Sequence, residues 1–252
     1  MGTIETIKKE SFLQSDELKK FINFLGEKYN EKNGINLQKE LDEYLWDGKD
    51  FEITYSMFEN MRRDFKNALS TNDEPIVFGL CEKILNWGGV GVATKNIKRI
   101  DKLREEKKFI STLQLANEII KSNKIDIDNI IIPSNSGFSK IYACLNDRFI
   151  IYDSRVAAMM CFLVKKCFSD GKNHFSLGKA SYQAKGERNP GAEFPLLSGN
   201  DKKYLKSNIL ASWILEAFAE QHPKLNYTTE KLIFAYQTSL FVMGKDLKKI
   251  DL

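Results

Sequence analysis

The sequence predicts an all-α protein of about ten helices joined by short connections. Three observations support this fold class. Apolar residues recur at steps of three and four in most segments, which is the spacing of one helix face. Only five prolines occur in 252 residues, so long helices are allowed. Alternating apolar patterns, which predict strands, are limited to two short runs at residues 125–132 and 149–152.

Four helices are predicted in the first part of the chain. Ser15 is placed to cap the first of them. Asp47-Gly48 closes the second, and Asn72 or Asp73 caps the fourth. The predicted ranges are residues 15–30, 37–46, 55–69 and 73–87.

A glycine-rich turn, W-G-G-V-G at residues 87–91, follows the fourth helix. Its backbone N–H groups could face a phosphate at the start of the next helix. The turn lacks the Lys-Ser/Thr of a P-loop and the preceding strand of a dinucleotide fold. We therefore interpret it as a plain turn between helices, in which glycine permits a positive φ.

Six further helices are predicted in the rest of the chain. Ser111-Thr112 supplies the cap of the second of these, and Asp153 opens the most hydrophobic one. Residues 169–201 are polar, rich in glycine and basic, and this segment is too long for a passive connector, so we predict a functional loop. The predicted helices cover residues 94–109, 111–121, from about 138 onward, 153–168, 204–221 and 228–244.

Composition narrows the class of protein. The net charge of +4 is mild, but basic residues gather at residues 95–108 and 165–206. Such patches suit a polyanion, although a solvated helix face explains any one of them as well. Four cysteines without a C-x-x-C pair need no disulfide or metal, and only two histidines argue against zinc chemistry and His-based acyl transfer. No cofactor is expected. The N-terminus has no signal-peptide core and no run reaches a membrane span, so a cytoplasmic protein is expected.

Residues 132–160 carry the most informative pattern. An apolar residue and a proline precede S-N-S-G and a helix, which is a helix–hairpin–helix pattern. Free N–H groups and the positive dipole end of that helix would form a non-specific phosphate site, although Asn-Ser-Gly also suits an ordinary turn. The candidate DNA-binding residues of the hairpin are Ser134, Asn135, Ser136, Gly137, Phe138 and Ser139.

Two ionisable residues lie at helix starts in this stretch. Lys140 is predicted in the first turn after the hairpin, where the helix dipole and nearby helix starts lower its pKa and favour a nucleophilic amine. An exposed lysine that binds phosphate is the simpler alternative. Asp153 is an N-cap before a nearly all-apolar helix, so we expect protein to surround it. A carboxylate in that position could stabilise a developing cation. Arg155 could hold this aspartate or a phosphate.

The segments G-F-S-K-I-Y-A at residues 137–143 and I-Y-D-S-R-V-A at residues 151–157 resemble the helix–hairpin–helix DNA glycosylases, especially the 8-oxoguanine type. In that family a glycine-containing hairpin precedes a catalytic lysine, and a V-D-[ST]-[HR]-V-like segment carries a catalytic aspartate. Lys140, Asp153 and Arg155 match these positions. The resemblance covers roughly residues 110–165 and implies two closely packed helical subdomains.

The chain also departs from the family pattern. Of the usual G-x-G only Gly137 is present, and Lys140 follows it by three residues where the family has two. Ser139 could therefore occupy the lysine position, as in members that only hydrolyse the base–sugar bond. The gap to Asp153 is shorter than usual by roughly five residues. The resemblance therefore implies a divergent branch whose substrate does not carry over.

The resemblance implies an enzyme that flips a base out of duplex DNA and excises it. Asp153 would stabilise positive charge at C1′, and Lys140 would attack C1′, with or without strand cleavage. The loop at residues 169–201 would form a lid or wedge, with Lys185 and Arg188 near the DNA. Candidate base-pocket residues, for which core packing is the alternative, are Trp87, Phe138, Tyr152, Tyr182, Gln183 and Trp213.

The sequence thus predicts a monomeric DNA glycosylase, active in base-excision repair or in defence against phage DNA that carries modified bases. The whole chain, residues 1–252, would form one unit with parts at residues 1–108, 109–168 and 169–252. A non-catalytic helix–hairpin–helix DNA-binding protein is the alternative, and an unrelated all-α protein is the third.

Overall fold

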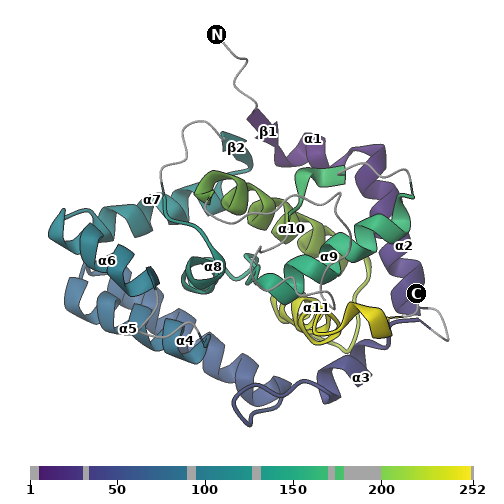
Figure 1. Cartoon of the computed structure of the whole chain (residues 1–252), viewed down its shortest axis with the longest axis horizontal. Coiled ribbons are helices and arrows are strands. Elements are labelled where there is room, and N and C mark those ends of the chain that lie inside the picture. Colours follow the sequence, from purple (N-terminus) through teal and green to yellow (C-terminus); the bar gives the residue numbers. More distant parts are fainter. Residues whose placement is uncertain are drawn as a thin grey trace.

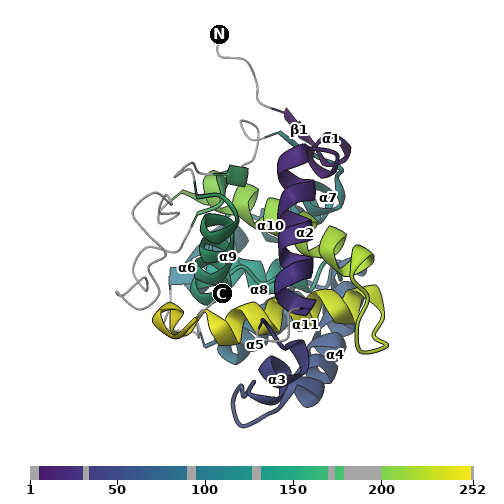
Figure 2. The same cartoon turned by 90° about the vertical axis from the view of Figure 1, so that its right-hand side faces the viewer.

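The computed structural model describes residues 6–30, 34–89, 95–126, 132–169, 174–178 and 200–250. Within these ranges it contains eleven α-helices and one small two-stranded sheet (Figure 1), which confirms the all-α class. Helices α9, α10 and α11 lie near the centre. Helices α4 to α7 cover one side of them, and α1 and α2 cover the opposite side (Figures 1 and 2).

The elements of the N-terminal part are β1 (Thr6–Lys8), α1 (Lys9–Leu13), α2 (Asp16–Asn30), α3 (Leu37–Asp42), α4 (Phe51–Ser70), α5 (Glu74–Trp87) and α6 (Lys95–Glu105). The later elements are α7 (Phe109–Lys121), β2 (Lys124–Asp126), α8 (Ser136–Ala143), α9 (Ser154–Cys167), η1 (His174–Ser176), α10 (Asp201–Gln221), α11 (Thr229–Met243) and η3 (Leu247–Lys249). The ten predicted helices appear among these elements in the predicted order, whereas the sequence did not predict β1, α1, η1 or η3.

The predicted end of the second helix is wrong. Helix α3 ends at Asp42, and the chain then makes a tight hairpin in which Trp46 and Lys49 exchange two backbone hydrogen bonds of 3.0 Å. Asp47 and Gly48, the two residues at its tip, have φ of 50° and 71°. Asp-Gly is a favoured pair for this type of turn, because both positions require positive φ. The hairpin fixes the position of Trp46.

Other predicted boundaries also differ from the structure. Helix α6 ends at Glu105 and not at residue 109, and helix α10 begins at Asp201 and not at residue 204. Helix α4 begins at Phe51 because the Asp50 side chain accepts a hydrogen bond from the N–H of Ile53. Helix α7 begins at Phe109, so Ser111-Thr112 lies inside the helix and does not cap it. The run at residues 125–132 contributes the strand β2, which pairs antiparallel with β1, whereas residues 149–152 form no strand.

The core lies between the three central helices and their neighbours. Helices α10 and α11 are buried on nearly all sides, unlike the amphipathic α2 and α4. Tyr29, Phe218 and Tyr236 pack together, with ring centroids 4.5–5.4 Å apart. Full burial of one such aromatic side chain stabilises the fold by about 1.5–3 kcal/mol. All four cysteines are free thiols.

The packing of α8 and α9 decides where the residues of the central stretch lie. Helix α8 packs against α5, and helix α9 packs against α11 and α2. The chain between α8 and α9 is short, and Lys140 of α8 and Asp153 before α9 line one cavity with residues of α11 and of the C-terminal end of α5. None of the described helices is long and apolar enough to cross a membrane.

Candidate active site

The hairpin before α8 is closed by side chains. Asn135 is the N-cap, and its Oδ1 accepts hydrogen bonds from the N–H groups of Gly137 and Phe138 at 2.8 and 3.1 Å. Its Nδ2 donates to Oδ1 of Asn96 on α6 at 2.8 Å. A Cβ on Gly137 would lie 2.2 Å from Nδ2 of Asn96, so only glycine allows this close approach.

A second set of contacts holds the hairpin from the other side. The N–H of Ser134 donates to Oδ1 of Asp201 at 2.9 Å, and Arg99 forms two hydrogen bonds to the same carboxylate at 3.1 and 2.5 Å. The N–H groups of Ser134, Gly137 and Phe138 are therefore bound to protein oxygens. The prediction that these groups are free for a phosphate does not fit this geometry.

Lys140 lies in the second turn of α8, not in the first as predicted, because the helix begins at Ser136. Its side chain folds back along the helix, and Nζ donates to the carbonyl oxygen of Ser136 at 3.1 Å. The residue is 5% exposed. Burial lowers the pKa of Lys140, because the charged amine loses its hydration, and the charge of Asp153 opposes part of that shift.

Gly88 makes room for this lysine. It is the C-cap of α5, and a Cβ there would lie 2.2 Å from Cδ and 2.5 Å from Cε of Lys140. Its φ is −73°, so the requirement for glycine comes from space and not from backbone conformation. The sequence interpretation of residues 87–91 as a plain turn missed this contact, since no local pattern shows which side chain crosses the turn.

Asp153 is the N-cap of α9, as predicted. One carboxylate oxygen accepts hydrogen bonds from the N–H groups of Arg155 and Val156 at 2.9 and 3.1 Å. The residue is half-buried. Asp153 and Lys140 line the same cavity, and the charge of Asp153 acts on Lys140 without an ion pair within 4.0 Å between these two described residues.

This cavity, which we call the chamber, has a volume of about 40 Å³. Its walls come from five parts of the chain and are mainly apolar, and five of the twelve lining residues are aromatic. Trp46 donates from Nε1 to the carbonyl oxygen of Trp87 at 2.8 Å and packs edge-on to Phe241. The chamber is lined by Tyr44, Trp46, Trp87, Gly88, Lys140, Ile151, Asp153, Val156, Phe234, Gln237, Thr238 and Phe241.

Helix α11 supplies chamber residues that the sequence reasoning missed. Gln237 accepts a hydrogen bond from the N–H of Ile151 at 2.7 Å through Oε1, which leaves its amide NH₂ as the donor it can offer to a ligand. Phe241 follows one helical turn later on the same face. A polar Gln-Thr pair inside an otherwise apolar helix was the available signal.

The other predicted site residues separate into distinct groups. Trp87 lines the chamber, as expected of a pocket residue. Ser139 is fully buried, donates to the carbonyl oxygen of Ser136 and does not line the chamber, so Lys140 and not Ser139 lies with Asp153. Tyr152 is also buried away from the chamber, because its hydroxyl donates to the carbonyl oxygen of Gly178 at 2.8 Å.

The remaining predicted residues do not reach the chamber. Phe138 and Trp213 are core side chains, and Arg155 lies with its guanidinium 4.4 Å from the centre of the Phe241 ring. Asn135 and Ser136 are half-buried at the hairpin. Four predicted residues lie outside the described part of the chain, namely Tyr182, Gln183, Lys185 and Arg188.

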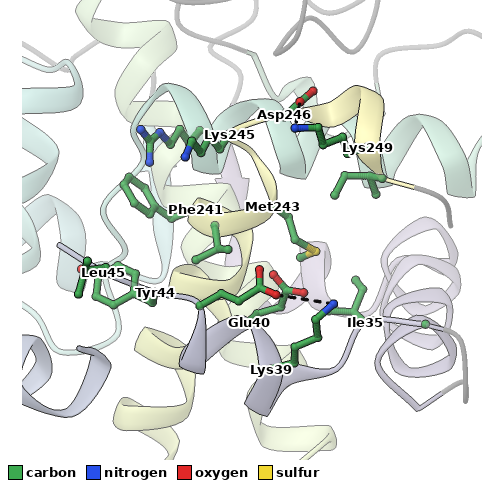
Figure 3. A pocket seen from close by; sticks show the side chains of 15 residues that line it. Ile35, Lys39, Glu40, Tyr44, Leu45, Phe241, Met243, Lys245, Asp246 and Lys249 are labelled. Carbon is green, nitrogen blue, oxygen red and sulfur yellow. Dashed lines mark ion pairs between the residues drawn. The ribbon is translucent and has the colours of Figure 1, made fainter. Parts of the chain in front are cut away.

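A larger groove of about 920 Å³ lies next to the chamber (Figure 3). Tyr44 and Phe241 line both, with ring centroids 6.1 Å apart, so these two rings form a wall between them. Figure 3 shows residues of α3 on one side of the groove and residues after α11 on the other. Arg155 also lines the groove.

Among the described residues, no group of three His, Cys, Asp or Glu side chains could hold a metal ion. Comparison with known proteins gives no matching protein family, no matching curated protein and no matching solved structure.

Proposed function

We propose that the protein is a DNA glycosylase of the helix–hairpin–helix type. The observation that carries this proposal is the composition of the chamber. The nearly fully buried Lys140 and the helix-capping Asp153 line it together with aromatic side chains. The resemblance of residues 137–157 to this enzyme class assigns the same two residues to catalysis. Sequence motif and three-dimensional position thus support the same pair.

The surroundings of Lys140 suit a nucleophilic amine. Its lowered pKa raises the share of neutral amine near neutral pH, and only the neutral amine carries the lone pair that attacks carbon. Few polar groups surround it in the chamber, so the charge of Asp153 acts through a poorly screened medium. This favours positive charge on a sugar bound between them.

The proposed reaction follows from these two groups. The Lys140 amine forms a bond to C1′ as the bond from C1′ to the base breaks, and the base leaves with the electron pair and then takes up a proton. The amine loses a proton as the sugar ring opens to a Schiff base, and water later releases the lysine. Asp153 stabilises the cationic C1′ during bond breaking. In a purely hydrolytic version, a water replaces the amine.

The walls supply the binding of a base. Trp46, Trp87 and Phe241 offer aromatic faces for stacking, and the NH₂ group of Gln237 can donate to a base carbonyl. A volume of about 40 Å³ holds little more than water, whereas ligand sites usually measure roughly 300–1,000 Å³. Binding of a flipped base therefore requires the chamber to widen.

Burial of Lys140 also separates the proposal from its alternative. A non-catalytic DNA-binding module would use an exposed lysine and free hairpin N–H groups for phosphates. Here the lysine is inside, and the N–H groups of Ser134, Gly137 and Phe138 are occupied. Both features favour an enzyme, which would serve base-excision repair or defence against modified phage DNA.

The test is borohydride trapping on a panel of duplexes, each with one oxidised, alkylated, deaminated or glycosylated base, with base release measured in parallel. We expect a trapped adduct with the wild type and none with Lys140→Gln. Lys83→Gln, an exposed lysine on α5, is the matched control and should keep the adduct. An adduct that persists in Lys140→Gln contradicts the assignment of the nucleophile. Duplex binding without base release on the whole panel favours the binding module.

A further inference from the structure

The groove beside the chamber has the volume of a ligand site. Its 920 Å³ falls within the range of roughly 300–1,000 Å³ that small-molecule sites occupy, whereas the chamber of 40 Å³ falls far below it. In the described part of the chain, Tyr44 and Phe241 are the only side chains that line both cavities. Tyr44 lies in the loop after α3 and not within a helix, so movement of that loop would join the two spaces.

The lining of the groove carries charge of both signs. Lys39 pairs with Glu43 at 3.7 Å, and Lys249 pairs with Asp246 at 3.1 Å. Glu40 adds another carboxyl group to the wall (Figure 3). Arg155 and Lys245 also line the groove, so four basic and three acidic side chains share it. Because acidic groups lie among the basic ones, the lining lacks the uniformly positive charge that tracks a DNA backbone.

The same lining suits a neutral ligand that is rich in hydroxyl groups. Carboxylates accept hydrogen bonds from O–H donors, and lysine ammonium groups donate to hydroxyl oxygens. The Tyr44 ring at the inner end offers an apolar surface to the C–H side of a sugar ring, and Arg155, which covers one face of Phe241, can donate to its hydroxyl oxygens. Burial raises the pKa of Glu40, so its carboxyl group keeps a proton to higher pH than an exposed glutamate does.

We infer that the groove binds a sugar-like, hydroxyl-rich substituent on the base that the enzyme excises, while the base itself enters the widened chamber. The substrate class is then a base with a bulky polar substituent. This inference rests on the proposed glycosylase function, because it places the reacting base beside Lys140 and Asp153.

The experiment uses duplexes that differ at one base, which is cytosine, 5-hydroxymethylcytosine, glucosylated 5-hydroxymethylcytosine or 8-oxoguanine. Base release and duplex affinity are both measured. We expect kcat/KM for the glucosylated base to exceed that for the hydroxymethylated base by about tenfold or more. Glu40→Gln and Asp246→Asn should reduce this ratio. Glu118→Gln, an exposed carboxyl on α7, is the matched control and should preserve it.

The outcomes separate the two proposals. Release of 8-oxoguanine without a preference for the glucosylated base overturns the groove inference and supports the glycosylase. An equal ratio in Glu40→Gln, Asp246→Asn and Glu118→Gln also overturns the groove inference. Tighter binding of the glucosylated duplex without release of any base, when it is lost in Glu40→Gln, supports the groove and contradicts the glycosylase. If no base is released and no duplex is bound selectively, both proposals are overturned.

Discussion

The starts of α8 and α9 show how one capping motif serves two purposes. In each, a side-chain oxygen of the N-cap accepts hydrogen bonds from the N–H groups two and three residues later. Asn135 does this for α8 at 2.8 and 3.1 Å, and Asp153 does it for α9 at 2.9 and 3.1 Å. The local structures are nearly the same, so the cap alone does not distinguish a structural joint from a candidate active site.

The two starts differ in charge and in what surrounds them. Asn135 is neutral, and its remaining polar group is bound to Asn96, while Asp201 holds the N–H of the neighbouring Ser134. Asp153 is a carboxylate that lines a cavity with Lys140. A helix start whose capping side chain is neutral and bound to protein at both polar atoms is a structural joint, whereas one that places a charge beside an aromatic cavity can act on a ligand.

Asp153→Asn should have the largest effect. Asparagine caps a helix as well as aspartate does, so the free energy of unfolding should stay nearly unchanged. Base release should fall by roughly 10²–10⁴, because the charge that stabilises C1′ is lost. Single-turnover base release and denaturant unfolding check the two parts. Asp50→Asn, the same change at the exposed N-cap of α4, should leave both values unchanged. Full activity of Asp153→Asn would show that its carboxylate has only a capping role.

Gly88→Ala should have the second-largest effect, which is on the rate of reaction of Lys140. Its new Cβ would overlap Cδ and Cε of Lys140, so the amine must move. A displacement of about 1 Å can reduce a rate by about 10²-fold. Borohydride trapping rates measure the effect. Gly79→Ala, also on α5, is the control, since a Cβ there meets nothing within 4 Å. Equal trapping rates in both variants would mean that the position of Lys140 does not depend on Gly88.

Asn135→Asp tests the neutral member of the comparison. The cap would remain, but the Nδ2 donor to Asn96 would become an oxygen facing another oxygen. We expect a loss of about 1–3 kcal/mol in the free energy of unfolding, because a buried hydrogen bond is replaced by repulsion. Chemical denaturation measures it, with Asn200→Asp at the exposed N-cap of α10 as the control. A stability equal to that of the control would show that Asn96 does not hold the hairpin.

The smallest expected effect is the pH dependence of stability that Lys140 contributes. Its folded-state pKa is lowered by burial, so between that pKa and about 10.4 the unfolded chain binds more protons than the folded one. The unfolding free energy of the wild type should therefore rise with pH across this window relative to that of Lys140→Met. Urea titrations at several pH values measure the difference. A difference that falls with pH would contradict the direction of the shift.

Local sequence signals predicted several elements correctly. Asp73 and Asp153 cap α5 and α9 as their sequence positions indicate. These caps depend on groups within three residues of each other, so the chain carries their geometry in any context. Spacing also predicted the amphipathic faces of α2 and α4, because burial of one face follows from helical periodicity.

Other features depend on contacts that sequence spacing does not contain. The Trp46 side chain reaches Trp87, which lies 41 positions away along the chain. Gln237 accepts the N–H of Ile151 across 86 positions. Gly88 is required because Lys140 crosses it, and Tyr152 is removed from the chamber by its bond to Gly178. None of these partners can be identified from the residues beside them in sequence.

The sequence by itself determined the helical class and the cap at the start of α9, which follow from periodicity and from interactions between near neighbours. Its resemblance to a known enzyme class supplied the lysine and the aspartate as candidate reactive groups. Only the tertiary structure decided that Lys140, and not Ser139, lies beside Asp153, that the hairpin N–H groups are occupied, and that a groove adjoins the chamber. Those outcomes depend on how α5, α8, α9 and α11 pack, because packing sets which side chains are buried together.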